Sequence, residues 1–299
     1  MATLEHHPDH VDSAGFDSWC VWQIWRDGTK TTRYWDPCFN LDGKVRDEIA
    51  DRYGPDVLAD YVIDRMRQAT EAEQPFYIHH NMLLPHWPIL ETPNEKASGE
   101  KPSLDGMITY LDGLVGRIVG AVDELGIADR TWVLFIGDNG TDSKVARKTS
   151  FGDVSGGKAI LGDAGLHVPM IIRGPGQVGG GTATTINDLV DMADVFPTLC
   201  ELAGVSLPES TKAKLDGVSF APRLLGAEGA TPLRSFVTRG YGGDDCVFDG
   251  AWRLHRKGGG VLYDCRNLPA EPKADLENDP EAQAAKERLM AVLESVKRR

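Results

Sequence analysis

The chain has 299 residues, of which 45 are acidic and 32 are basic, so its formal net charge at pH 7 is -13. This negative charge argues against nonspecific binding to nucleic acid or to an anionic membrane surface. No apolar run approaches the roughly 20 residues needed to span a bilayer. No basic and then apolar export signal follows Met1, which leaves the localisation open. Five widely spaced cysteines form no C-x-x-C pair, which argues against a structural zinc site or a dense disulfide framework.

The first 130 residues predict a loop-rich start, two helices and a strand. Residues 1–45 are rich in Trp, Asp, Gly and Pro without a sustained period, so we expect a structured loop region. Apolar residues recur at helical spacing over 56–67 and 103–126, which predicts two amphipathic helices. Between them, residues 75–81 predict a strand that leads into M-L-L-P-H-W-P. The prolines of this segment present His86 on a rigid loop.

The stretch T-W-V-L-F-I-G-D-N-G, residues 131–140, predicts a buried strand that ends at a polar loop. In a parallel sheet the carboxyl ends of strands carry the ligand-binding loops, so Asp138 and Asn139 would lie at the edge of a site. Their oxygen donors suit Ca²⁺ or Mg²⁺ better than zinc or copper. On this stretch alone, an Asp-Asn-Gly turn is the simpler interpretation.

The second half first continues the α/β pattern and then changes. The segment S-G-G-K that ends at Lys158 is not a P-loop, because alanine follows the lysine. Residues 168–172 predict another buried strand and residues 191–203 another helix. From about residue 234, short strands over 235–239, 252–256 and 261–265 precede a charged helix that begins at Pro280. We therefore predict an α/β domain over 1–228 and a small C-terminal α+β subdomain, an antiparallel sheet with a helix, over 229–299.

A series of short motifs runs along nearly the whole chain. They are G-F-D from Gly15, R-Y-W-D-P from Arg33, Y-G-P-D, P-H-W-P, Y-L-D-G-L-V-G-R-I from Tyr110, G-D-N-G, G-G-K, V-P-M-I-I-R-G-P-G, D-M-A-D-V-F-P-T-L-C-E-L-A-G and L-D-G-V-S-F. In their order and spacing they resemble the sulfatase family of the alkaline-phosphatase-like superfamily. The resemblance implies a three-layer α/β fold, with the sheet sandwiched by helices, and a hydrolase of sulfate esters.

The resemblance also implies roles for four residues. Asp138 and Asn139 look like metal ligands, for Ca²⁺ or Mg²⁺, and this overrides the turn interpretation. His86 and Lys158 look like the family's catalytic and substrate-binding histidine and lysine, which contact the sulfate ester. Positive groups there would stabilise the negative charge of a transferring sulfuryl group. Without the family context, His86 would be an ordinary loop histidine and Lys158 a solvated lysine. We expect all four side chains to converge at one edge of the sheet.

The chain also departs from the family pattern. Residues 161–169 read L-G-D-A-G-L-H-V-P where the family reads T-x-E-G-G-x-R-V-P, so Asp163 and His167 keep the charge type only approximately. The first-strand metal aspartates and the C-x-P-S-R or S-x-P-S-R motif, from which the family's formylglycine nucleophile is made, do not occur. The chain therefore resembles a sulfatase that starts after its nucleophile, and covalent catalysis has no first step.

Three interpretations stay open. The first is an arylsulfatase-like sulfuric ester hydrolase acting on a sulfated small molecule or glycan, inactive as this chain alone and complemented by an N-terminal segment. The second is a catalytically silent remnant or an anion-binding module. The third is a phosphate or phosphonate ester hydrolase, because the fold does not settle the function. We also expect the isolated chain to be poorly stable, because the absence of a central strand would expose a sheet edge.

Overall fold

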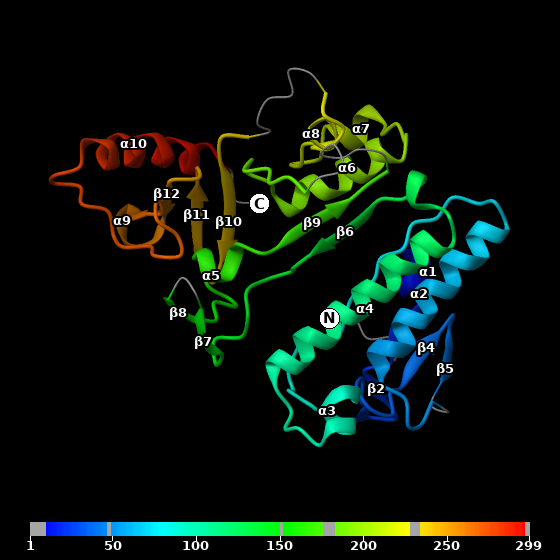
Figure 1. Cartoon of the computed structure of the whole chain (residues 1–299). Helices are drawn as coiled ribbons and strands as arrows, with labels where there is room; N and C mark the ends of the chain where they lie inside the picture. Colours follow the sequence, from blue (N-terminus) through cyan, green and yellow to red (C-terminus); the bar gives the residue numbers. More distant parts are fainter. Residues whose placement is uncertain (1–9, 47–48, 150–151, 176–182, 228–233, 297–299) are drawn as a thin grey trace. The chain divides into compact units, whose positions relative to one another are not determined.

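The computed structural model describes residues 10–46, 49–149, 152–175, 183–227 and 234–296, and the side chains of 146–154 are not described. The chain forms two compact units, Met1–Thr131 and Trp132–Arg299, and each is considered by itself. Figure 1 labels their helices and strands. Among the described helices, none combines the length and the apolar character that a membrane span requires.

Two long helices form the framework of the first unit. They are α2 (Gly54–Glu71), which is a few residues longer than the helix predicted over 56–67, and α4 (Leu104–Glu124), which lies within the helix predicted over 103–126. The helices lie side by side, and their shared core contains Ala59 from α2 and Leu114 from α4. Leu84, two residues before His86, is 5% exposed and packs into the same core. The loop that carries His86 is therefore anchored on the helix pair.

Residues 10–46 contain more regular structure than the predicted loop region. After the short helix α1 (His10–Ser13), three short strands form an antiparallel sheet in the order β1-β4-β5, and β2 and β3 form a separate hairpin. Their bounds are β1 (Cys20–Trp22), β2 (Trp25–Arg26), β3 (Thr29–Lys30), β4 (Phe39–Leu41) and β5 (Lys44–Arg46). Strands of two or three residues are too short to show an alternating pattern, which is why the sequence did not predict them.

The predicted strand over residues 75–81 is wrong, because the structure has no strand there. The composition favours a strand, but a strand also needs a neighbour to complete its ladder of hydrogen bonds. None of the described strands pairs with this segment. Phe76 and Tyr77 are exposed. The chain continues through the His86 loop to α3 (Pro93–Ser98) and, after α4, to the short helix η1 (Ala128–Arg130).

The second unit begins with the predicted central strand. β6 (Val133–Ile136) pairs with β9 (Met170–Arg173), so strands exist where both were predicted. The pairing is antiparallel, with Val133 opposite Arg173, and this corrects the expected parallel arrangement. The residues of β6 are half-buried rather than buried. Between the two strands lie the hairpin of β7 (Ala146–Thr149) and β8 (Gly152–Ser155) and the short helix α5 (Asp163–Leu166).

The helix predicted over residues 191–203 is present in two parts. A single-turn helix, η3 (Met192–Asp194), leads into α6 (Val195–Leu202). The side chain of Asp191 accepts the Ala193 N–H, and the side chain of Asp194 accepts the Asp191 N–H, which fixes the start of the turn. Two short helices follow, α7 (Glu209–Lys212) and α8 (Ala221–Leu224).

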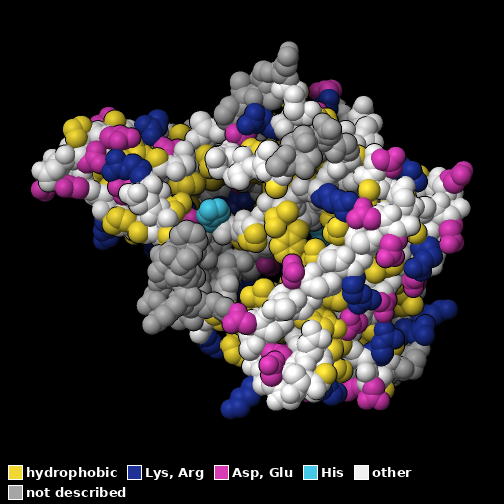
Figure 2. All heavy atoms as spheres, in the orientation of Figure 1, with side chains coloured by type: hydrophobic (Ala, Val, Ile, Leu, Met, Phe, Trp, Pro, Cys, Tyr) yellow, Lys and Arg dark blue, Asp and Glu magenta, His cyan; other side chains and the backbone are white. Residues whose placement is uncertain are grey.

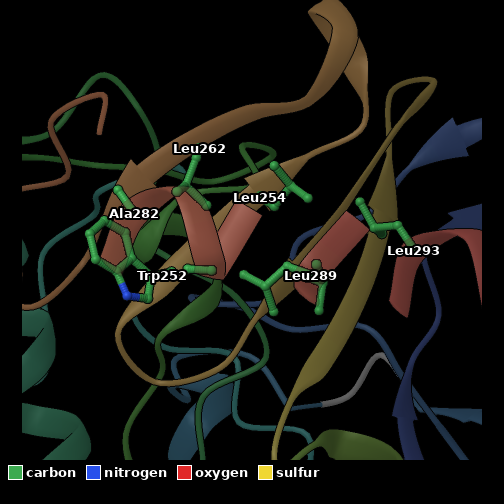
Figure 3. Packing of buried hydrophobic residues seen from close by; sticks show 8 residues of the cluster. Trp252, Leu254, Leu262, Ala282, Leu289 and Leu293 are labelled. Atoms are coloured by element: carbon green, nitrogen blue, oxygen red, sulfur yellow. The ribbon is translucent and has the colours of Figure 1, made fainter. Parts of the chain in front are cut away.

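A four-stranded antiparallel sheet with a helix on one face forms the end of the second unit. Its strand order is β10 (Val237–Tyr241), β11 (Asp244–Phe248), β12 (Trp252–His255) and β13 (Val261–Asp264), with α9 (Lys257–Gly260) between the last two. Helix α10 (Pro280–Ser295) packs Leu289 and Leu293 against Trp252 and Leu254 of the sheet (Figure 3). Strand β11 was not predicted. The predicted domain boundary at 228 and 229 falls outside the described residues and stays a prediction.

Candidate functional site

Asp138 and Asn139 lie in the loop that follows β6. The Gly137 N–H donates to the Pro169 carbonyl at 3.0 Å, which extends the β6–β9 pairing by one residue before the loop begins. Asp138 is exposed, and the Asn139 amide donates to one of its carboxylate oxygens at 2.6 Å. The sequence therefore presents two polar side chains directly beyond a strand end, with Asp138 exposed and Asn139 half-buried.

Backbone hydrogen bonds join this loop to the segment that contains Lys158. The Gly140 N–H donates to the Gly165 carbonyl at 3.0 Å, and the Lys158 N–H donates to the Thr141 carbonyl at 2.9 Å. We call residues 137–142 and 156–167 the glycine loop cluster. The cluster places Lys158 against Thr141, two residues beyond Asn139, although Lys158 and Asn139 are 19 positions apart in the sequence.

Close backbone contacts explain the glycines of this cluster. A Cβ atom at Gly140 would lie 1.9 Å from the Ala164 carbonyl oxygen, and one at Gly157 would lie 2.4 Å from the Ala164 carbonyl carbon. Neither position has room for a side chain, so the two loops approach as closely as they do only because both residues lack one. The geometry of the cluster is thus set by the backbone itself.

The Lys158 side chain is half-buried in this cluster. Within the part of the chain that the structure describes, no carboxylate forms an ion pair with its ammonium group. Lys144, on the loop after Asp142, is exposed by contrast. A half-buried ammonium group without an acidic partner is suited to an anionic ligand, because the ligand would supply the missing opposite charge.

Asp138 and Asn139 agree in kind, but not in number, with a calcium or magnesium site. Their carboxylate and amide oxygens are hard donors of the type these cations prefer, and Ca²⁺ takes roughly 6 to 8 of them. Among the described residues, no group of three or more His, Cys, Asp or Glu side chains is placed to hold a metal ion. These two residues offer donor atoms of the right kind, but too few of them for a complete cation shell.

Helix α5 of the cluster is tied to the C-terminal sheet through Glu271. One carboxylate oxygen of Glu271 accepts the Asp163 N–H at 2.7 Å, and the other pairs with the buried Arg253 of β12. The Asp163 carboxylate lies 3.1 Å from Nδ1 of His167, and this hydrogen bond raises the pKa of His167. Sequence reasoning missed Glu271 and Arg253, because each is about 90 to 110 residues from Asp163 and no local motif marks them.

His86 belongs to the first unit, where the side chain of Tyr34 holds its loop. The Tyr34 hydroxyl donates to the Leu83 carbonyl at 2.9 Å and also contacts the His86 carbonyl oxygen. Tyr34 is 2% exposed, and this burial raises the pKa of its hydroxyl to about 12. His86 itself is exposed. Because it lies in a different unit from the glycine loop cluster, the predicted convergence of the four site residues stays a prediction.

Charged side chains of both signs lie on the surface of the chain. On the face shown in Figure 2, acidic and basic side chains are interspersed over the coloured residues, and no large basic patch is visible there. The expectation that the chain binds no nucleic acid rests on the acidic excess of the sequence and stays a prediction.

Comparison with known proteins decides the family. The family described as Sulfatase matches residues 5–205, which is about two thirds of the chain. The chain belongs to the sulfatase family. Human arylsulfatase A is 31% identical to this sulfatase-family chain over 174 residues, which cover 58% of the chain and 33% of arylsulfatase A. Rat steryl-sulfatase is 28% identical over 160 residues, which cover 52% and 27%. The chain thus spans about a third of the length of the curated relatives it matches.

Solved structures establish the fold of this family member. The crystal structure of Ps i-CgsB in complex with k-i-k-neocarrahexaose matches with a TM-score of 0.72 and 21% identity, covering 98% of this chain and 68% of that one. The putative sulfatase yidJ from Bacteroides fragilis matches with a TM-score of 0.66 and 19% identity, covering 94% and 66%. The predicted fold class, the alkaline-phosphatase-like α/β fold, is confirmed.

Proposed function

We propose that this chain carries the ester-binding part of a sulfuric ester hydrolase, with Lys158 and His86 as the residues that contact the sulfate ester. The observation that carries the proposal is the hydrogen bond from the Lys158 N–H to the Thr141 carbonyl, which fixes Lys158 on the same loop cluster as Asp138 and Asn139. Membership of the sulfatase family over residues 5–205 supports the choice of ester.

The roles follow from charge. The Lys158 ammonium group would bind a non-bridging or leaving-group oxygen of the ester, where negative charge develops as the S–O bond breaks. The His86 imidazole would donate a hydrogen bond to another oxygen of the same ester. These contacts orient the ester and stabilise charge, but they supply no nucleophile, and the chain contains no C-x-P-S-R or S-x-P-S-R motif. We therefore propose that turnover needs a complementing N-terminal segment.

Asp138 and Asn139 are proposed as two ligands of a divalent cation, Ca²⁺ or Mg²⁺. The kind of donor atoms supports this assignment, and the half-buried Lys158 on the same loop cluster would let the cation and the ammonium group share an anionic ligand. When bound, the cation would stabilise negative charge on the ester. Its remaining ligands would come from the complementing segment or from water.

The proposed substrate is a sulfated small molecule or a sulfated glycan. Two observations on other proteins support these classes: the curated relatives include an arylsulfatase and a steryl-sulfatase, and a structural neighbour was crystallised with a neocarrahexaose. The net charge of -13 on this chain would repel an anionic substrate at long range, so a local positive group such as Lys158 is needed to bind it.

The test is hydrolysis of a chromogenic aryl sulfate by this chain and by a chain extended with an upstream segment that carries a maturable C-x-P-S-R, both with calcium. We expect turnover only from the extended chain, and Asp138→Ala should abolish the metal-dependent part of it. A matched aryl phosphate is the control substrate. Turnover of the sulfate by the short chain would contradict the need for a complementing segment, and a preference of the extended chain for phosphate would favour a phosphohydrolase. Sulfate binding without turnover by either chain would favour an anion-binding module.

A further inference from the structure

Arg33 lies directly against the imidazole of His86. Its guanidinium nitrogen Nη2 is 2.7 Å from His86 Nδ1, and the same nitrogen donates to the Trp87 carbonyl. The two residues are 53 positions apart in the sequence, and both belong to the first unit. The contact is therefore one that only the folded chain creates.

Nδ1 of His86 has two competing neighbours. The Arg33 guanidinium can only donate hydrogen bonds, since it has no acceptor and stays protonated. The Trp87 carbonyl oxygen, 2.8 Å from Nδ1, can only accept. If Nδ1 carries a proton, it can donate a hydrogen bond to the Trp87 carbonyl, but its N–H then faces an N–H of the Arg33 guanidinium, and two donors repel each other. If Nδ1 is unprotonated, it accepts from Arg33, and Arg33 also satisfies the Trp87 carbonyl. The second arrangement leaves no donor facing a donor.

Aromatic rings hold Arg33 in this place. The guanidinium carbon lies 5.0 Å from the centre of the Trp22 ring and 5.1 Å from the centre of the Tyr34 ring, both within the range of cation–π attraction. Tyr34 in turn bonds to the carbonyls of the His86 loop. Within the described residues no carboxylate forms an ion pair with Arg33, so its donors remain directed at the loop.

We propose that Arg33 is a positioning residue that holds the neutral form of His86 as the Nε2–H tautomer. Arg33 occupies Nδ1, so the ring proton is placed on Nε2. His86 then presents one fixed hydrogen-bond donor outward, which is what a contact to an anionic ester oxygen requires. The use of this donor in catalysis rests on the proposed function. The assignment of the tautomer does not depend on that function.

The test is NMR of the chain labelled with ¹⁵N at histidine, in which long-range ¹H–¹⁵N correlations identify the protonated ring nitrogen. His86→Asn assigns the signal by its loss. We expect wild type to show Nε2–H, and Arg33→Met to shift His86 to Nδ1–H, because the Trp87 carbonyl then remains as the partner of Nδ1. Arg33→Lys should restore much of the Nε2–H form, because an ammonium group also only donates. Arg26→Met, which removes an exposed arginine paired with Asp27, should change nothing.

Two results would overturn the proposal. The first is a wild-type His86 that is mainly Nδ1–H, a result that does not depend on Arg33→Met and so holds even if that variant fails to fold. The second is an Arg33→Met variant that folds and keeps the Nε2–H tautomer. The proposal and the proposed function can fail separately: the predicted tautomer in a chain that binds no sulfate would support the role of Arg33 and contradict the sulfate site.

Discussion

The two loops that carry the proposed ester contacts are held in opposite ways. Side chains hold the His86 loop: Tyr34 and Arg33 bond to its carbonyls, and Leu84 anchors it in the core. The backbone holds the Lys158 loop, through hydrogen bonds from Gly140 and Lys158 and through contacts that leave no room for a Cβ atom.

The difference indicates how each loop responds to change. A side-chain-held loop can be loosened one contact at a time, by substitutions that leave its own backbone intact. A backbone-held loop resists such changes, since its hydrogen bonds survive most substitutions, but it depends entirely on a few glycines. In the proposed site, most substitutions should therefore leave the position of Lys158 unchanged, whereas the position of His86 should respond to changes in single side chains.

The largest effect should come from adding a methyl group to the backbone-held loop. Gly140→Ala would place a Cβ atom 1.9 Å from the Ala164 carbonyl oxygen, so the loops must move apart and lose the Gly140–Gly165 hydrogen bond. We expect a loss of about 3 kcal/mol in the free energy of unfolding, measured by urea denaturation. The control is Gly113→Ala in the middle of α4, where nothing lies within 4 Å and a gain of up to about 1 kcal/mol is expected. Equal effects at both sites would contradict the close packing.

The next prediction concerns the pH dependence of the stability of the first unit, to which the Glu95 side chain contributes. Buried Glu95 accepts hydrogen bonds from the backbone and hydroxyl groups of Thr92 and Ser103. Burial alone would raise the pKa of Glu95, but these four bonds outweigh it and lower the pKa. The stabilisation is thus complete above the ordinary pKa of a glutamate and is lost as the pH falls through the lowered pKa of the folded state.

Glu95→Gln should therefore lower the free energy of unfolding by about 2 to 3 kcal/mol at pH 7. The new amide N–H₂ would face hydrogen-bond donors that the carboxylate oxygen accepted from. The difference in the free energy of unfolding between wild type and this variant should shrink as the pH is lowered below the ordinary glutamate pKa. Urea denaturation over a pH series measures it, with Glu100→Gln at an exposed site as the control, expected within about 0.5 kcal/mol of wild type. A difference that grows in acid would contradict the lowered pKa.

A smaller effect is expected from the hydroxyl that ties down the His86 loop. Tyr34→Phe keeps the ring in the core and leaves the Leu83 and His86 carbonyls without that donor. We expect the free energy of unfolding to fall by about 1 to 2 kcal/mol and the backbone amides of residues 83–87 to exchange hydrogen faster. Tyr77→Phe is the matched control, since Tyr77 is 60% exposed and its hydroxyl contacts only the exposed His79. Unchanged exchange in Tyr34→Phe would show that the core contact of Leu84 is sufficient.

The sequence predicted those helices and strands that can be recognised from their own residues alone. The helices α2 and α4 show clear apolar periodicity, the charged segment from Pro280 predicted α10, and β6 and β9 are apolar runs of strand length, so all five could be placed. What depends on a distant partner could not be predicted. Residues 75–81 have the composition of a strand but no described neighbour, and the direction of β9 relative to β6 is not encoded in either run.

The candidate site shows the same division. Motif resemblance identified His86, Asp138, Asn139 and Lys158 because each lies in a short recognisable segment. It did not show how these segments are held: Arg33, although part of the motif R-Y-W-D-P, contacts His86 across 53 positions, and Glu271 contacts Asp163 across 108. Supporting contacts of this kind have no sequence spacing to follow, and only the folded chain shows them.

The most direct test of the central claim, that Lys158 is the core of an anion site, is calorimetric titration of inorganic sulfate into wild type and two lysine variants. Lys158→Met removes the half-buried ammonium group, and Lys144→Met removes an exposed one from the neighbouring loop, so the two variants change the net charge equally. The account predicts measurable binding by wild type, weakening by about tenfold or more in Lys158→Met, and a change of less than about twofold in Lys144→Met. Equal weakening in both variants, or no sulfate binding by folded wild type, would contradict it.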